Sequence, residues 1–250
     1  MPFAARASCL QTMKNSPHLA FCSQDTIIMN TEIKPVITAN DLKVFIQLFY
    51  NLYRNSPYAT PYLYMDEVKT LSKDKNPAFD FCEAAYFLAY QQGKPVGRIA
   101  AIINRRANEY WKRNTVRFGW FDFIDDPDVS QSLLKAVEEW GKNKGMTEMA
   151  GPLGFEDMDR EGMLVSGFDT LSTMYVNYNY PYYPQHIEAM GGFKKDNDYV
   201  EYEIKIPEKA PERMLTTAEM IGKRYHLEVR KFSRDELTKG GRGHELFNIL

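Results

Sequence analysis

The sequence has no long apolar run and almost no net charge. Its 31 lysine and arginine residues are balanced by 33 aspartate and glutamate residues, which leaves a net charge of −2. Such a balance provides no broad field for binding nucleic acid, so we expect no nucleic-acid partner. No segment approaches the roughly 18–20 consecutive apolar residues that a membrane-spanning helix requires, so we expect no transmembrane segment either.

Cysteine is also scarce. Cys9, Cys22 and Cys82 are an odd set without the C-x-x-C spacing of a thiolate metal site. We therefore expect neither a disulfide framework nor a metal site, and the cysteine usage favours a reducing, cytoplasmic location.

The first 29 residues contain no uninterrupted apolar segment of the kind found in secretory signals. Acidic residues are nearly absent before Asp25, which leaves a transit peptide as one interpretation. We favour a disordered leader, or a start codon misassigned ahead of a natural start at Met29.

The middle of the chain mixes helical and strand patterns. Asn40 is the expected N-cap of an amphipathic helix that extends to Tyr53, and a shorter helix is predicted over Met65–Leu71. Strand-forming residues on both sides of a turn with glycine and proline predict a hairpin of Ala84–Tyr90 and Val96–Ile103.

Further strands and helices follow. A third strand is predicted over Thr115–Ile124, and a helix and a short strand at Glu148–Ala150 come after it. A helix over Tyr182–Met190 then precedes an alternating strand, Tyr199–Ile206. This order predicts a mixed α/β domain over residues 30–207.

Residues 208–250 predict a linker and the beginning of a second unit. A helix is expected over Glu212–Tyr225, a strand over Leu227–Lys231 and a capping box at positions 233–236. The sequence stops inside the apolar rhythm of positions 246–250, which we interpret as a unit cut short. An apolar face exposed there would favour self-association.

The late helix resembles a segment of the GNAT superfamily of N-acetyltransferases. In that superfamily a short helix ends in a glycine turn that delivers a phenylalanine to the core. Here the segment reads Tyr183-Pro184-Gln185-His186-Ile187-Glu188-Ala189-Met190-Gly191-Gly192-Phe193. The order of the preceding elements is similar too, so the resemblance implies a GNAT-like acyl-CoA N-acyltransferase fold.

A closer resemblance, over about residues 30–250, is to a group of long bacterial GNAT-like proteins built of two such halves. The matching stretches include Lys75-Asn76-Pro77-Ala78-Phe79, Arg117-Phe118-Gly119-Trp120-Phe121-Asp122-Phe123 and Asp159-Arg160-Glu161-Gly162-Met163-Leu164-Val165. Some bacterial ceramide synthases look like relatives of this group and transfer a fatty acyl group from a thioester to an amine. The resemblance implies a small-molecule or lipid amine as acceptor, with this chain as a fragment of impaired activity.

The resemblance also implies acetyl-CoA or a longer acyl-CoA as the acyl donor. GNAT enzymes hold the pyrophosphate of coenzyme A on a glycine-rich turn at the start of the central helix, where backbone N–H groups converge on an anion. Here that place reads Asp125-Asp126-Pro127-Asp128, with Asp128 as the expected N-cap. Carboxylates without glycine disfavour phosphate, so we expect a thioester site in a second half or between two halves.

Asp122 is a candidate general base. Its strand would place Phe118, Trp120, Asp122 and Ile124 on one face, and GNAT enzymes often place a base on this strand. The alternative is an aspartate at a strand end that reaches solvent.

The glycine-punctuated loop at positions 151–162 supplies further candidates. Loops at strand ends often carry functional groups, and a carboxylate from Asp159 or Glu161 could deprotonate an amine. Gly151, Gly154 and Phe155 are predicted to bind substrate. The alternative is a solvated charged loop whose glycines form turns.

The late helix supplies a candidate acid. Tyr183 and His186 are three residues apart on one helical face, and GNAT enzymes often place there a tyrosine that reprotonates the departing thiolate. Tyr182, Asn177 and Asn179 are predicted to bind substrate. The alternatives are a structural histidine among aromatic residues and an asparagine-rich turn.

Two hypotheses stay open at the level of the sequence. The leading one is an N-acyltransferase that uses Asp122 or a loop carboxylate as base and Tyr183 or His186 as acid. The other is a non-catalytic GNAT-like half that binds a ligand or packs against a catalytic half, which the acidic turn favours.

Overall fold

The computed structural model describes residues 31–248. The chain divides into two compact units, Met1–Asn197 and Asp198–Leu250. The expectations for the leader and for the last two residues lie outside the described residues.

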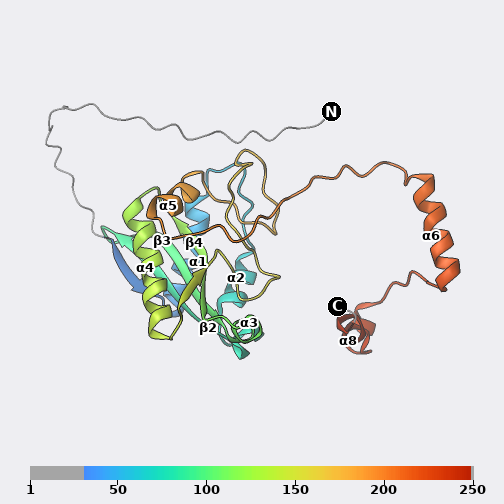
Figure 1. Ribbon diagram of the computed structural model, residues 1–250, viewed down its shortest axis with the longest axis horizontal. Coiled ribbons are helices and arrows are strands. Elements are labelled where there is room, and N and C mark those ends of the chain that lie inside the picture. The colour runs from blue at the N-terminus through green and yellow to red at the C-terminus, as the bar shows by residue number, and fades with distance from the viewer. Residues whose placement is uncertain (1–30, 249–250) are drawn as a thin grey trace. The chain divides into compact units, whose positions relative to one another are not determined.

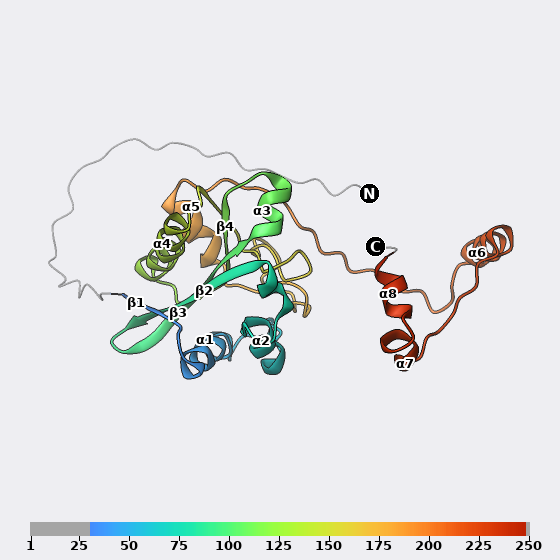
Figure 2. The same ribbon diagram turned by 90° about the horizontal axis from the view of Figure 1, so that it is seen from below.

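The first unit contains a five-stranded sheet with helices on both faces (Figures 1 and 2). Neighbouring strands from β1 to β4 are antiparallel, whereas β5 runs parallel to β4, which confirms the predicted mixed α/β class. The strands follow one another across the sheet in chain order: β1 (Glu32–Pro35), β2 (Cys82–Gln91), β3 (Lys94–Asn104), β4 (Thr115–Phe123) and β5 (Glu148–Ala150).

Two helical layers cover the sheet (Figure 2). Helices α1 (Ala39–Leu52) and α2 (Tyr64–Leu71) lie on one side, and α4 (Pro127–Asn143) and α5 (Tyr182–Met190) lie on the other. The sequence predicted these four helices, β2 to β5 and the hairpin. It did not predict β1 or the short helix α3 (Arg105–Trp111).

Fully buried side chains of α4 pack on β3. Val129 and Leu133 are completely buried against this strand, and Gly97 allows the close approach. A Cβ at position 97 would lie only 2.8 Å from atoms of both side chains, so the helix could not sit this close to a larger residue. On the opposite face, Phe45 of α1 packs with Ile102 of β3.

The N-caps predicted for α1 and α4 were wrong. Thr38, not Asn40, caps α1 and forms a capping box with Asp41. Asp126, not Asp128, caps α4, because Pro127 occupies the first helical position, where its missing N–H costs nothing. Near the start of each helix several neighbouring residues are able to cap it. In both cases a residue before the predicted one forms the cap.

A β-bulge interrupts β4. The register pairs Arg98 with Asp122 but Ala100 with Gly119, so two residues of β4 oppose Ile99. Trp120 has φ +45°, in the left-handed region. The bulge reverses the alternation of side chains, so the predicted common face was wrong. Phe118 packs in the core under α4, whereas Trp120 packs on the α1 side.

The second unit is described over residues 198–248 and contains three helices. These are α6 (Glu212–Tyr225), α7 (Arg234–Thr238) and α8 (Arg242–Phe247). The predicted helix and the capping box of Ser233 with Glu236 are confirmed. The strands predicted over Tyr199–Ile206 and Leu227–Lys231 are not formed, since neither segment has a neighbouring strand to pair with in this part of the chain.

Candidate functional site

A cavity of about 210 Å³ lies beside the bulge of β4. It is bounded by α2, by β3 and β4, by the long connection between β5 and α5, and by Tyr183 of α5. Gly119 permits that connection to pass close to the strand, because a Cβ there would lie 2.5 Å from the carbonyl oxygen of Leu153. The bulge therefore both shapes the cavity and turns Trp120 and Asp122 towards it.

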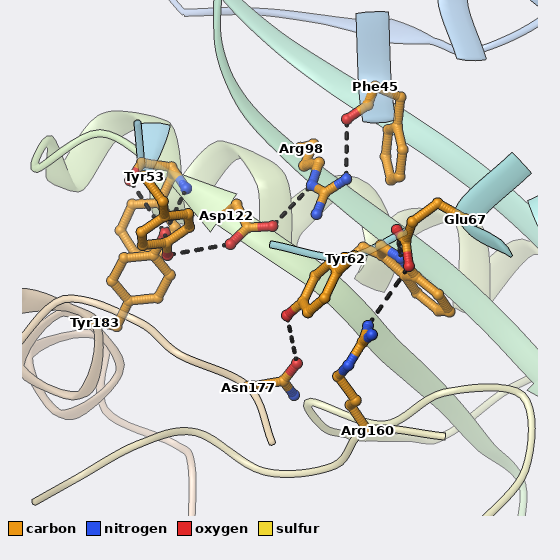
Figure 3. A network of polar contacts seen from close by, with 11 residues as sticks. Phe45, Tyr53, Tyr62, Glu67, Arg98, Asp122, Arg160, Asn177 and Tyr183 are labelled. Atoms are coloured by element: carbon orange, nitrogen blue, oxygen red, sulfur yellow. Dashed lines mark hydrogen bonds and ion pairs between the residues drawn. The ribbon is translucent and has the colours of Figure 1, made fainter. Parts of the chain in front are cut away.

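A buried ion pair forms one wall of the cavity. The Arg98 Nε donates to Asp122 Oδ2 at 2.7 Å, and the two side chains are 1% and 10% exposed. Arg98 Nη1 donates to the carbonyl oxygen of Phe45 at 3.0 Å. Among residues 31–248, its Nη2 has no hydrogen-bond partner although it is buried, and Figure 3 shows it directed towards the side where Tyr62 lies. Buried N–H groups are normally hydrogen-bonded, so an acceptor oxygen is expected next to this nitrogen.

Two tyrosines continue from the ion pair. The Tyr53 hydroxyl lies 3.2 Å from Asp122 Oδ1 and 2.8 Å from the Tyr183 hydroxyl. Tyr183 in turn accepts from the Phe123 N–H at 3.1 Å. Carboxylate, Tyr53 and Tyr183 therefore form one continuous polar chain (Figure 3). Burial, and then the nearby negative charge of Asp122, raise the pKa of Tyr183 well above its ordinary value, so this hydroxyl keeps its proton at neutral pH.

A second pair of opposite charges lies across the cavity. Glu67 is 5% exposed, accepts from the Trp120 Nε1 at 2.8 Å and lies 3.5 Å from Arg160 Nη1. The Arg160 guanidinium lies over the Tyr62 ring, 3.4 Å from its centroid. The Tyr62 hydroxyl donates to Asn177 Oδ1 at 3.3 Å. The cavity thus has a fixed polar lining from four separate segments of the chain.

In the loop at positions 151–162, the carboxylate of Asp159 bonds to the backbone of the loop itself. Asp159 lines the cavity, but its Oδ2 accepts from the backbone N–H of Phe155 at 2.7 Å and of Glu156 at 3.3 Å. This carboxylate therefore closes the turn of its own loop. Phe155 is 1% exposed and packs in the core of the α1 side.

Asn177 and Asn179 hold the same connection in place. The Asn179 side chain bonds both backbone groups of Leu164, and the Asn177 amide donates to the carbonyl oxygen of Gly162 at 3.1 Å. Both asparagines line the cavity while they fix the chain around it.

His186 belongs to another polar cluster. Its Nδ1 lies 2.8 Å from Ser130 Oγ, and its Nε2 lies 2.9 Å from Asp125 Oδ1. Tyr182 donates its hydroxyl to the carbonyl oxygen of Phe123 at 2.6 Å. His186 contacts the beginning of α4 through Ser130, whereas Tyr182 packs on Phe123 and on His186, and neither lines the cavity.

The structure thus brings together only part of the predicted site. The predicted residues that line the cavity are Asp122, Gly154, Asp159, Asn177, Asn179 and Tyr183, and those that do not are Gly151, Phe155, Glu161, Tyr182 and His186. Sequence reasoning missed Tyr53, Tyr62, Glu67, Arg98 and Trp120. Arg98 carried a usable signal, since it is the one charge within the apolar run of positions 96–103. For Tyr53 and Glu67 no such signal exists.

The beginning of α4 does not suit a pyrophosphate group. Asp126 Oδ1 accepts from the Asp128 N–H at 2.9 Å, so the side chain of the cap already occupies a donor there. Asp126 Oδ2 accepts from Gln91 Nε2 at 2.8 Å, and Asp128 Oδ2 accepts from Thr31. These carboxylates would repel a phosphate at the one helix end where a glycine-rich turn would bind it.

Among residues 31–248, no group of three or more histidine, cysteine or carboxylate side chains is placed to hold a metal ion. Within the same range, no helix combines the length and apolar character that crossing a membrane requires.

Two curated bacterial proteins are similar to this chain, although no family model matches it. Protein YghO of Escherichia coli is 35% identical over 162 residues, which are 65% of this chain and 41% of that protein. The bacterial ceramide synthase of Caulobacter vibrioides is 33% identical over 196 residues, which are 76% of this chain and 50% of that protein. The chain therefore spans half or less of the length of the curated relatives it matches.

Solved structures similar to the chain are acetyltransferases. The aminoglycoside acetyltransferase AAC(6')-Iy, bound to a bisubstrate analogue of coenzyme A, aligns with 71% of this chain and 99% of its own, at 17% identity and a TM-score of 0.40. A tandem GNAT protein from the clavulanic acid biosynthesis pathway aligns with 48% of this chain and 35% of its own, at 16% identity and a TM-score of 0.39.

Proposed function

We propose that this chain provides both the acceptor site and the acid–base groups of an N-acyltransferase, which joins an acyl group from a thioester to an amine. The observation that carries the proposal is the cavity beside β4, which places the Asp122 carboxylate and the protonated Tyr183 hydroxyl together. The similarity to a protein named bacterial ceramide synthase supports the same class, because a ceramide is an amide of a lipid amine.

In the reaction the amine nitrogen bonds to the acyl carbon, the carbon–sulfur bond breaks, and one proton moves from nitrogen to sulfur. A cationic amine first releases one proton to solvent to become a nucleophile, and the nitrogen loses a second proton as the amide forms; the Asp122 carboxylate is the base that accepts this second proton in the cavity. Tyr183 keeps its proton and is suited to give it to a departing thiolate. Tyr53 connects the two, so the proton accepted by Asp122 has a path of hydroxyl groups back to Tyr183.

Arg98 and Glu67 define what else the cavity accepts. The Nη2 of Arg98, which has no partner in the described part of the chain, is suited to an acceptor oxygen of the substrate, since a buried donor left unpaired is costly. Four carboxylates line the cavity, and only two guanidinium groups do. The carboxylates are those of Asp66, Glu67, Asp122 and Asp159, and the guanidinium groups are those of Arg98 and Arg160. That excess of negative charge favours a cationic amine over an anionic ligand.

A second candidate function is a non-catalytic half that supplies the acceptor site while the thioester binds elsewhere. The beginning of α4 favours it, because Asp126 caps the helix and Asp125 and Asp128 add negative charge beside the cap. No step is therefore assigned to coenzyme A at this helix end. The larger size of the curated relatives is compatible with a donor site in the remainder of such a protein.

The test is calorimetric titration of the 250-residue chain with acetyl-CoA, with palmitoyl-CoA and with sphinganine, a lipid amine. Saturable binding of a thioester and of the amine, with loss of amine binding in Asp122→Asn but not in Asp125→Asn, is expected for a complete acyltransferase site. Binding of the amine alone would support the second candidate. Binding of neither ligand by a folded sample would contradict both.

A further inference from the structure

Helix α3 presents two large aromatic side chains to solvent, and the proposed reaction uses neither. Tyr110 and Trp111 are 76% and 69% exposed. Their rings meet edge to face with centroids 4.8 Å apart. Aromatic side chains of this size gain most when they leave water, so an adjacent pair kept at the surface marks an interaction site.

Cationic residues flank this pair along the chain. Positions 105–113 contain four exposed cations, Arg105, Arg106, Lys112 and Arg113, and one carboxylate, that of Glu109. Arg105 pairs with Glu83 at 3.1 Å, which leaves Arg106, Lys112 and Arg113 in excess over Glu109. Although the whole chain has a net charge of −2, this segment is locally positive. Such a surface attracts an anionic partner within roughly a Debye length of about 8–10 Å.

The backbone that carries these side chains is tied to the rest of the first unit. Asn104 caps α3 by accepting from the Ala107 N–H at 2.9 Å, and its amide donates to the carbonyl oxygen of Phe155 at 2.8 Å. Asn108 donates to the carbonyl oxygen of Thr115 at 3.0 Å. Figure 2 shows α3 between the ends of β3 and β4. The aromatic pair is thus held on an ordered support.

We propose that α3 docks this protein on an anionic lipid surface, with Tyr110 and Trp111 at the level of the headgroups and Arg106, Lys112 and Arg113 against lipid phosphates. Tryptophan and tyrosine favour this interface because one end of each ring system is apolar and the other polar. Basic side chains next to them add attraction to anionic lipids. This inference stands on α3 alone and does not depend on the proposed reaction.

Nucleic acid is the other anionic surface that such cations would attract. Proteins that bind single strands stack successive bases on exposed aromatic faces. Here the two rings pack edge to face against each other, which presents a compact apolar wedge instead of two parallel platforms. The geometry therefore favours the lipid surface.

The test is sedimentation of the 250-residue chain with vesicles of phosphatidylcholine alone and of phosphatidylcholine mixed with phosphatidylserine. The parent is expected to bind the mixed vesicles only. Binding should fall at least about tenfold in Lys112→Glu/Arg113→Glu and in Tyr110→Ser/Trp111→Ser. Circular dichroism checks that these surface variants remain folded.

Matched variants elsewhere on the first unit act as controls. Lys73→Glu/Lys75→Glu changes two exposed cations, and Val165→Ser/Leu171→Ser changes two apolar side chains that are 68% and 66% exposed. Both should bind vesicles as the parent does. A parent that does not bind the mixed vesicles, or α3 variants that bind them like the parent, would overturn the proposal. So would tighter binding to a single-stranded oligothymidylate, lost in the same α3 variants.

Discussion

Arg98 of β3 and Asp122 of β4 form an ion pair with an N–O distance of 2.7 Å, although neither side chain is more than 10% exposed. The Arg98 guanidinium lies over the rings of Phe45 and Phe49, and both residues of the pair line the cavity. Because both charges have left water, each stabilises the fold only while the other is present.

Removal of the arginine tests this dependence. Arg98→Met should lower the free energy of unfolding by about 3–5 kcal/mol, because it leaves a buried carboxylate without its partner. Arg105→Met is the matched control. Arg105 pairs with Glu83 at 3.1 Å but is largely exposed, so its loss should cost no more than about 1 kcal/mol. Urea unfolding measures both, and equal losses would contradict the account.

The helix caps give a second prediction, since the structure and the sequence place them differently. Thr38→Ala and Asp126→Ala should each lower the stability by about 1 kcal/mol, because each removes a side-chain acceptor from a helix N-terminus. Asn40→Ala, at the position that the sequence predicted, should have little effect. A loss for Asn40→Ala as large as for Thr38→Ala in chemical unfolding would mean that α1 starts where the sequence predicted.

Buried tyrosines predict a loss of stability in alkaline solution. Burial raises the pKa of Tyr53 and Tyr183 well above the value of about 10 found in an unfolded chain. Above pH 10 the unfolded chain loses these protons while the folded chain keeps them. The stability they provide is therefore complete below about pH 10 and decreases as the pH rises beyond it.

Urea unfolding between pH 8 and pH 11, with tyrosinate absorbance as a second signal, checks this expectation. Tyr53→Phe/Tyr183→Phe should flatten the decrease relative to the parent, because two of the groups that cause it are gone. A decrease of the same slope in this double variant would assign the alkaline loss to other groups.

Gly119 gives a prediction about the close passage beside the bulge. Gly119→Ala would place a Cβ 2.5 Å from the carbonyl oxygen of Leu153, a backbone atom that cannot rotate away. We expect a loss of about 1–3 kcal/mol. Gly222→Ala in α6 is the control, since its Cβ would meet its nearest neighbour at 3.7 Å, and thermal unfolding should show no loss there.

The sequence predicted most helices and the central strands because their patterns are local. The apolar rhythm of α4 and the turn between β2 and β3 need no distant partner to be recognised. It failed at Tyr199–Ile206, where alternation alone predicted a strand, because a strand forms only with a neighbour to pair with.

The site was harder to predict for a physical reason. The ion pair, the Tyr53 contact and the Glu67 contact join residues 24 to 69 positions apart, and only the folded sheet brings them together. The bulge in β4 changed which residues face the cavity, and no single residue of that strand predicts a bulge from the sequence. Asp122 and Tyr183 were predicted as separate candidates, and the structure adds Tyr53, which connects them.

The most direct measurement is release of free thiol from acetyl-CoA and palmitoyl-CoA by the 250-residue chain, with sphinganine as the amine. The account predicts turnover that falls about 10²–10⁴-fold in Asp122→Asn and in Tyr183→Phe, as expected when a general base or acid is removed. Asp125→Asn and Tyr182→Phe change the neighbouring carboxylate and hydroxyl outside the cavity and should keep the parental rate. Turnover that survives in Asp122→Asn and Tyr183→Phe, or its absence in a folded parent that binds both substrates, would contradict a catalytic role for this cavity.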